Sequence, residues 1–341
     1  MNTFKTTLKN IIVFVILLVI TIYVVYNKED IHDILSIISD TNPIFLLIGF
    51  LFMFTFFCIQ AVNVKSLFAS LGIYVPYFKM LKFTLIEFFF SAITPASTGG
   101  QPVEIYYMSK EGIPVSKSTL VLLIQICSYQ FAVLFYTVVG ACIMPEVITG
   151  IVKYFFIYGV IMNIIVIFAM IICIFSTKTA ERIVRFFIKI AKFFHIKKII
   201  NKEENIIKGL DKYHEGSDYI KTHKIEFVKS MLRALLQLGC HFVITYFVYR
   251  ALGLHKYGLI SIASMQAIFY ASSGCVPLPG AVGISELMYL TIYESVFGTD
   301  LLRPAMLLNL GISFYLFVII TLFVVAFNVI KLNMRKGKEN E

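Results

Sequence analysis

Apolar residues occur along this chain in long stretches, and most of the charged residues lie between those stretches. A helix needs about 20 apolar residues to cross the roughly 30 Å hydrocarbon layer of a bilayer. Six stretches reach or approach that length, namely 10–26, 43–64, 118–144, 150–175, 230–250 and 305–330. The pattern therefore predicts an all-α integral membrane protein with about six full transmembrane helices.

Two further apolar segments, 79–115 and 257–297, are interrupted by proline and glycine and contain glutamates. Irregular backbone at membrane depth is tolerated only where it is buried in protein or lines a wet cavity. Each segment is therefore predicted to form a re-entrant or broken-helix hairpin.

The two hairpin segments contain matching motifs, 182 positions apart. The first reads SAITPASTGGQPVEIYY over 91–107, and the second reads SGCVPLPGAVGISELMY over 273–289. They share Ser, Pro, Glu and Tyr at equivalent places, with a Gly-rich bend before the glutamate: Ser91, Pro95, Glu104 and Tyr107, then Ser273, Pro277, Glu286 and Tyr289. Three full spans separate the hairpins, so the second copy is inverted. We therefore expect two inverted-repeat halves whose motifs meet near the midplane, as in transporters built from repeats.

The chain is interpreted as one polytopic membrane domain covering 1–341. Its first half is 1–175, a basic cytoplasmic connector covers 176–229, the second half is 230–330, and a short basic tail covers 331–341. With the N-terminus inside, only five of the 30 Lys and Arg residues fall in or beside external loops: Lys28, Lys153, Arg250, Lys256 and Arg303. This distribution follows the positive-inside rule and predicts that both termini are cytoplasmic.

The connector contains apolar residues at helical spacing beside basic ones. The apolar set is Ile183, Phe186, Phe187, Ile190, Phe193 and Phe194. A basic amphipathic helix of this kind suits the surface of an anionic inner leaflet. An elbow helix that connects the two halves is an equally good interpretation, and both can hold together.

Composition excludes a water-soluble domain, because 59% of the 341 residues are hydrophobic and the mean hydropathy is +0.84. The net charge of +10 would favour nucleic acid in a soluble protein, but here the basic residues set orientation in the bilayer. We therefore expect no nucleic-acid partner. The first apolar run follows Lys5 and Lys9 and is not followed by a small-x-small cleavage site, so an uncleaved signal anchor is expected.

The six cysteines and six histidines show no metal-ligand spacing. Gly99 and Gly100 are not followed by the lysine and hydroxyl residue of a nucleotide-binding loop. We expect no metal site and no cofactor, so any driving force for transport would be an ion gradient or the lipid gradient itself.

Glu104 and Glu286 are the first candidates for a functional site. A carboxylate at membrane depth is costly, and it is usually turned inward toward a substrate or a proton. The alternative is that each glutamate caps its broken helix. Glu87 and Arg233 are further candidates, since an anionic headgroup needs a cation and a cationic one needs a carboxylate, although Arg233 can also snorkel to the inner interface.

The two bends are candidates for binding an anion such as a lipid phosphate. Exposed amides at a helix start favour negative charge. The first bend leads into a helix from about Gln101, the second into one from about Ile284; their residues are Pro95, Ser97, Thr98, Gly99 and Gly100, then Pro277, Pro279, Gly280 and Gly283. The alternative is that proline and glycine only shape a kink. Other polar residues in apolar runs are predicted to form interhelical hydrogen bonds: Gln60, Asn63, Gln125, Gln130, Gln237, His241, Gln266 and Asn309.

The phrases TPASTGGQPVEIYYMSKEGIPVSKS at 94–118 and PLPGAVGISE at 277–286 resemble the membrane (flippase) domain of bacterial lysyl-phosphatidylglycerol synthase/flippase proteins. The resemblance implies movement of an aminoacylated phospholipid between leaflets. It also implies a family name, phosphatidylglycerol lysyltransferase, and a link to resistance against cationic antimicrobial peptides. In full-length relatives a separate soluble domain makes the lipid, and none follows the last span here, so we expect a stand-alone flippase-like member.

The expected function is translocation of a phospholipid, such as lysyl-phosphatidylglycerol or a related polar lipid, in a bacterial cell membrane. One alternative is an enzyme or partner subunit in aminoacyl-lipid synthesis, and another is a secondary carrier of a small solute. The expected partners are the phospholipid substrate, the anionic inner leaflet and a separate synthase or glycosyltransferase.

Overall fold

A computed structural model gives the fold of the chain. It describes residues 36–94, 98–176, 224–274 and 283–339, together with seven single positions in the connector. Within these residues the chain is α-helical and has no strand, which confirms the predicted all-α membrane class. The predicted first span, 10–26, and most of the predicted amphipathic helix of the connector lie outside the described residues.

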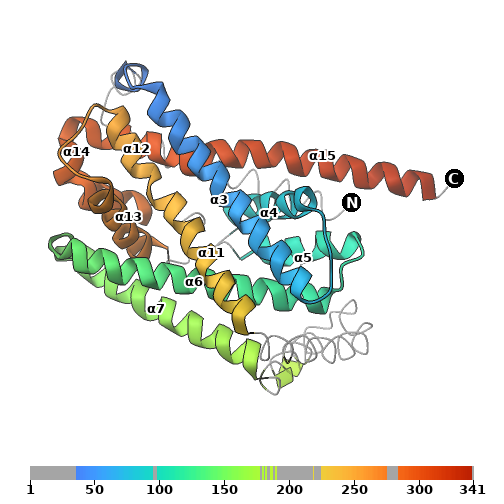
Figure 1. Cartoon of the computed structure of the whole chain (residues 1–341). Coiled ribbons are helices and arrows are strands. Elements are labelled where there is room, and N and C mark those ends of the chain that lie inside the picture. Colours follow the sequence, from blue (N-terminus) through green and yellow to red (C-terminus); the bar gives the residue numbers. More distant parts are fainter. Residues whose placement is uncertain are drawn as a thin grey trace.

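The helices follow the predicted order of spans and hairpins (Figure 1). Their bounds are α3 (Pro43–Ser70), α4 (Tyr77–Ala92), α5 (Gly100–Lys110), α6 (Val115–Ile143), the 3₁₀ turn η1 (Pro145–Val147), α7 (Gly150–Phe175), α11 (Lys224–Phe242), α12 (Ile244–Ala251), α13 (Leu259–Ser273), α14 (Ile284–Leu310), the π-helix η2 (Gly311–Tyr315) and α15 (Leu316–Glu339). Five stretches within the described ranges are long and apolar enough to cross a membrane: Pro43–Ser70, Val115–Ile143, Gly150–Ile174, Lys224–Ala251 and Ile284–Val329.

These stretches confirm four predicted spans and correct the fifth. The predicted spans 43–64, 118–144, 150–175 and 230–250 each correspond to one of them. The last predicted span begins earlier than residue 305, because α14 is broken only at Gly298 (φ +69°) and is helical again from the next residue. The external loop expected around Arg303, over 298–304, is therefore wrong: the chain leaves the helical conformation only at Gly298, because one glycine at positive φ is enough to break the helix. The predicted tail is also helical as far as Glu339.

The repeat extends well beyond the two motifs. Shifting the first half by 182 positions places α3 on α11 and α12, and α4 on α13. The same shift places α5 on the first part of α14, and α6 on the segment after Gly298 that continues into α15. The two halves therefore share the order span, hairpin helix, hairpin helix, span, and α7 stands outside this unit.

Equivalent helices of the two halves exchange partners. The α4 helix of the first hairpin packs against α15 of the second half, and α13 of the second hairpin packs against α6 of the first. Helices α3 and α11, which are equivalent, lie side by side in direct contact (Figure 1). The hairpins themselves lie toward opposite ends of the bundle in Figure 1. This exchange fits two inverted halves that share one core.

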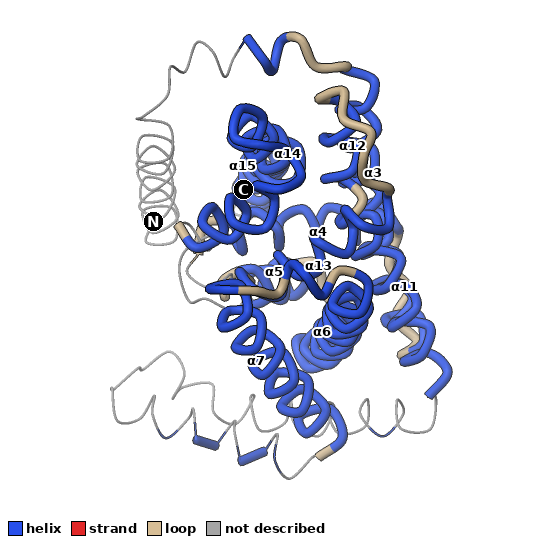
Figure 2. The backbone as a smooth tube through the Cα atoms, turned by 90° about the vertical axis from the view of Figure 1, so that its left-hand side faces the viewer, coloured by secondary structure: helices blue, strands red, loops and turns tan. Residues whose placement is uncertain are grey.

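Helix α7 forms an outer wall of the bundle (Figure 2). It exposes a long row of apolar side chains, including Tyr154, Ile157, Ile161, Ile165 and Phe168. Such a face would be costly in water and is expected to meet lipid tails. The opposite face of α7 packs against α6 and α13.

Candidate functional site

The first hairpin closes where the start of α5 meets the end of α4. A Cβ atom placed on Gly100 would clash with Ser91 Oγ and would lie 2.6 Å from Glu87 Oε1. Glycine is therefore needed here for close approach, not for an unusual φ. The bend presses the first turn of α5 directly onto the Glu87 carboxylate.

Glu87 is the centre of this contact. Its Oε1 accepts hydrogen bonds from Ser91 Oγ at 2.7 Å and from Gln101 Nε2 at 3.1 Å. Gln60, on α3, neighbours the Glu87 carboxylate, and its Oε1 accepts a hydrogen bond from Gln237 Nε2 of α11 at 3.0 Å. The carboxylate is thus held by donors from its own hairpin and linked to a helix of the other half.

Glu104 lies one turn into α5 and is almost fully buried, with 1% of its surface exposed. Its Oε1 has no hydrogen-bond partner among the described residues, and Glu87 is the neighbouring charge. A buried carboxylate normally pairs with a donor or a cation. Two neighbouring carboxylates with one unpaired oxygen form a place that attracts a proton or a cationic group.

The backbone at the start of α5 is partly satisfied by the bend itself. The Gly99 N–H donates to Thr94 Oγ1 at 3.0 Å, and Thr94 Oγ1 donates to the Phe90 carbonyl at 2.6 Å. Thr98 lies in the turn before α5. Pro95 and Ser97 lie outside the described residues, so the rest of the predicted anion site at this bend stays a prediction.

The second hairpin uses its glutamate differently. Glu286 Oε2 accepts hydrogen bonds from the Gly283 N–H, at the start of α14, and from Ser285 Oγ at 3.0 Å. Gly283 has φ +89°, a conformation that favours glycine. Glu286 is therefore a helix cap, which is the alternative that the sequence left open. Pro277, Pro279 and Gly280 lie outside the described residues.

The π-helix η2 lies beside both hairpins. The ring of Phe314 packs edge-on against Phe88 of the first hairpin, with 6.0 Å between centroids. Its neighbour Tyr315 lies within electrostatic reach of Glu286 in the second hairpin. Short π-helical segments occur frequently at functional sites. Here the π-helix contacts the helix that carries Glu87 and also lies near Glu286.

Helix α11 carries a polar stripe into the bundle. Ser230 Oγ donates to Ser128 Oγ of α6 at 2.8 Å, and Gln237 bonds Gln60 as described above. Arg233 lies between them, and its Nη1 is buried without a hydrogen-bond partner among the described residues. The structure forms no ion pair between Arg233 and any of the three glutamates, so the predicted cation lies apart from the hairpin carboxylates.

The predicted interhelical hydrogen bonds are confirmed for Gln60, Gln130, Gln237, Gln266 and Asn309. In the second half, Thr245 Oγ1 lies 2.9 Å from Gln266 Oε1 and 3.0 Å from Asn309 Oδ1. The equivalent positions in the first half are Asn63 and Thr84, which are fully buried. Their polar side-chain atoms have no partner among the described residues. At this layer of the bundle the half that contains Glu87 and Glu104 therefore has unpaired polar atoms where the other half has hydrogen bonds.

An ion-paired cluster fixes the outer edge of the first hairpin. Glu111 follows α5 and contacts Lys79 Nζ at 2.7 Å and Lys82 Nζ at 3.1 Å. Partial burial would raise the pKa of the Glu111 carboxyl, but hydrogen bonds and charge from the two lysines lower it to about 2. The cluster ties the start of α4 to the turn between α5 and α6.

Sequence reasoning missed several of these residues. Thr94 and Glu111 act through local geometry that no spacing rule predicts. Asn163 could have been found from the sequence, because it is a polar residue inside the apolar run of α7. The hydrogen bond between Tyr129 and Tyr270 joins residues 141 positions apart, and no sequence pattern predicts it. Glu87 and Glu104 were predicted as candidate carboxylates and Gly99, Gly100 and Gln101 as residues of the bend and helix start, and the structure brings these five together in one hairpin.

Comparison with known proteins covers most of the chain. Residues 10–321 match the sequence model of one protein family, described as the lysylphosphatidylglycerol synthase TM region. The chain is also 24% identical over 280 residues to a UPF0104 membrane protein of Archaeoglobus fulgidus. That alignment covers 78% of this chain and 81% of the archaeal protein. Both hairpin motifs fall within the matched range of the family model.

Proposed function

Because the chain belongs to the family of the lysylphosphatidylglycerol synthase transmembrane region, we propose that it moves a phospholipid headgroup across the membrane while the acyl tails stay in the bilayer. The fold supports this proposal through two inverted halves with a hairpin in each. Broken helices at equivalent places in two repeats are where repeat-built transporters bind their substrates.

The observation that carries the proposal is the buried pair Glu87 and Glu104. Glu87 accepts hydrogen bonds from Ser91 and Gln101, whereas Glu104 keeps one oxygen without a partner among the described residues. A hydrogen-bonded carboxylate beside one with an unpaired oxygen suits transient binding of a positively charged group. The amino group of an aminoacylated lipid has that charge, and so does a coupling proton.

The lipid phosphate would be met by helix starts rather than by a cation beside the glutamates. Helix α5 begins at Gly100, next to Glu87, and α14 begins at Ile284, next to Glu286. Arg233 lies on α11 and forms no ion pair with the glutamates of the hairpins, and we assign it to an anionic headgroup as it enters or leaves. We further propose a bacterial cell membrane location, an anionic inner leaflet as neighbour, and a separate synthase or glycosyltransferase that supplies the lipid.

A cell-based measurement of lipid sidedness tests the proposal. An amine-reactive probe that does not cross membranes reports the fraction of lysyl-phosphatidylglycerol in the outer leaflet, and extraction reports the total. Cells without the protein are expected to retain the lipid on the inner leaflet at an unchanged total. The intact chain should restore the distribution and Glu104→Gln should not. Glu294→Gln, an exposed glutamate of α14, is the matched control and should behave as the intact chain.

The same measurement separates the alternatives. A fall in total aminoacylated lipid with normal sidedness would indicate a role in synthesis, as an enzyme or a partner subunit. Unchanged lipid in both respects, with loss of uptake of a soluble compound, would indicate a solute carrier. Either result would contradict lipid translocation.

A further inference from the structure

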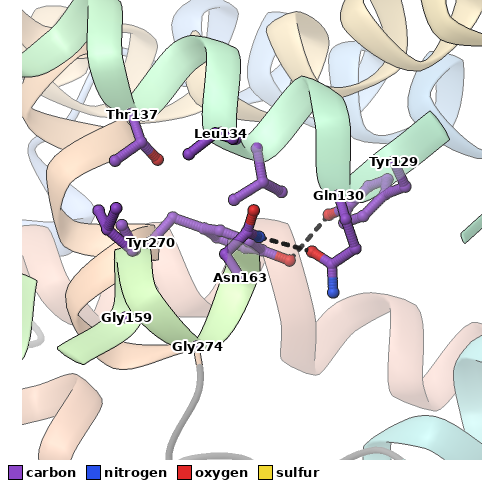
Figure 3. Close-up of a pocket in the computed structure, with 11 residues that line it drawn as sticks. Tyr129, Gln130, Leu134, Thr137, Gly159, Asn163, Tyr270 and Gly274 are labelled. Atoms are coloured by element: carbon purple, nitrogen blue, oxygen red, sulfur yellow. Dashed lines mark hydrogen bonds between the residues drawn. The ribbon is translucent and has the colours of Figure 1, made fainter. Parts of the chain in front are cut away.

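A cavity of about 100 Å³ lies between α6, α7 and α13 (Figure 3). Its polar lining comes from Tyr129, Gln130 and Thr137 of α6, Asn163 of α7 and Tyr270 of α13. One water molecule takes about 30 Å³ of liquid volume, so the space accommodates roughly three waters or one small polyol. The cavity is separate from the carboxylates of the first hairpin.

Glycines bring the cavity walls together. A Cβ atom on Gly159 of α7 would clash with the backbone carbonyl of Ala271 on α13. A Cβ atom on Gly140 of α6 would lie 2.8 Å from the carbonyl oxygen of Ser264, which is also on α13. Both long helices are therefore in backbone contact with α13, and the cavity is a local opening in a tightly packed region.

The polar side chains of the lining are uncharged. Asn163 Nδ2 donates to Gln130 Oε1 at 2.9 Å, and the hydroxyls of Tyr129 and Tyr270 are bonded at 2.8 Å (Figure 3). Asn163 is 95% buried near the middle of α7, and its Oδ1 has no hydrogen-bond partner among the described residues. A buried acceptor without a donor in an apolar span is costly, which indicates that a ligand with a donor belongs there.

The position of the cavity connects it to both hairpins. Tyr129 lies within electrostatic reach of Glu87 in the first hairpin. At the other side, Gly274 of the lining directly precedes the second Gly-rich bend. A headgroup that faces the Glu87 and Glu104 pair could therefore place a short neutral arm in this cavity.

We propose that the cavity binds the hydroxylated, uncharged part of the transported headgroup, such as a glycerol unit. This inference rests on the proposed lipid translocation. Each hydroxyl both donates and accepts, so one can donate to Asn163 Oδ1 while another bonds the tyrosine pair. No charged side chain lines the cavity among the described residues, which leaves phosphate and ammonium groups without a counter-charge here.

The test compares two lipids that differ only in hydroxyl groups. Phosphatidylglycerol and phosphatidylpropanol have the same charge and the same three-carbon headgroup, but the second lacks the two hydroxyls. With acyl-chain labels in proteoliposomes, the intact protein is expected to move phosphatidylglycerol at least about tenfold faster, because a site built to hydrogen-bond hydroxyls rejects an analogue without them. Asn163→Leu should remove that preference by slowing phosphatidylglycerol alone. Tyr270→Phe, which keeps the ring, should reduce the preference as well.

Asn328→Leu is the matched control, since Asn328 is equally buried on α15, outside the cavity, and its Nδ2 has no partner among the described residues. It should leave the ratio of the two rates unchanged. Two results would overturn the assignment of the cavity without contradicting lipid translocation. One is equal transport rates for both lipids in the intact protein, and the other is an unaltered ratio of these rates in both cavity variants. Movement of neither these two lipids nor the lysyl ester of phosphatidylglycerol would overturn both proposals. Inhibition by free glycerol that Asn163→Leu abolishes would assign the cavity to a soluble polyol instead.

Discussion

Gly100 and Glu87 are in such close contact that a Cβ atom on the glycine would lie 2.6 Å from the Glu87 Oε1 atom. The Gly-rich bend therefore places a helix start against a carboxylate that Ser91 and Gln101 hold in position. The second copy of the motif has no carboxylate at the place of Glu87, since a shift of 182 positions leads to Phe269. The two hairpins share a backbone pattern but differ in chemistry.

The Gly100 contact predicts a strong effect of one methyl group. Gly100→Ala should lower the free energy of unfolding by about 1–3 kcal/mol, the usual range for overpacking, and should slow transport by pushing α5 away from Glu87. Gly258→Ala is the matched control, because a Cβ there meets nothing within 4 Å. Thermal unfolding in detergent checks both variants, and equal midpoints would contradict the close approach.

The two motif glutamates should respond in opposite ways to the same substitution. Glu286→Gln weakens a cap on α14 and is expected to cost about 0.5–2 kcal/mol of stability. Glu104→Gln replaces a buried carboxyl group whose Oε1 has no partner among the described residues, so stability should be equal or higher. Transport should fall at least about tenfold in Glu104→Gln, or about 1.4 kcal/mol in the barrier. If Glu104→Gln lowers stability but leaves transport intact, Glu104 is a structural residue and not part of the transport site.

The buried threonines Thr84 and Thr245 should also respond in opposite ways to the same substitution. Thr84 Oγ1 has no partner among the described residues, so Thr84→Val should raise stability by about 1 kcal/mol. Thr245 is within hydrogen-bonding distance of Gln266 and Asn309, so Thr245→Val should lower stability by about 1–3 kcal/mol. The unfolding midpoints of the two variants, measured under the same conditions, test whether stability shifts in opposite directions. Equal shifts would show that the hydrogen bonds of Thr245 contribute nothing.

Low pH should weaken the ion pairs that Glu111 forms with Lys79 and Lys82. The pKa of its carboxyl is lowered from 4.5 to about 2, so the ion pairs stabilise the fold above pH 4.5 and lose that contribution as the pH falls toward 2. Glu111→Gln should therefore be less stable than the intact protein at pH 7 and approach it at pH 3. A difference that does not change with pH would assign the effect to packing.

Continuous apolar runs were sufficient to predict the spans at α3, α6, α7 and α11, and proline and glycine located both hairpins. The different roles of Glu104 and Glu286 could not be predicted from the motif. They depend on whether the carboxylate folds back onto its own helix start, as Glu286 does onto Gly283. The bond between Asn163 and Gln130 depends on packing between helices, and sequence spacing contains no record of it.

The most direct test of the central claim measures lipid movement in proteoliposomes that contain only the purified protein. Labelled phosphatidylglycerol and its lysyl ester are placed in one leaflet, and a quencher that does not cross the membrane follows their appearance in the other. We expect movement with the intact protein, its loss in Glu104→Gln and its retention in Glu294→Gln. Folded intact protein that moves neither lipid would contradict the account, and Glu104 would then be a structural residue of the hairpin.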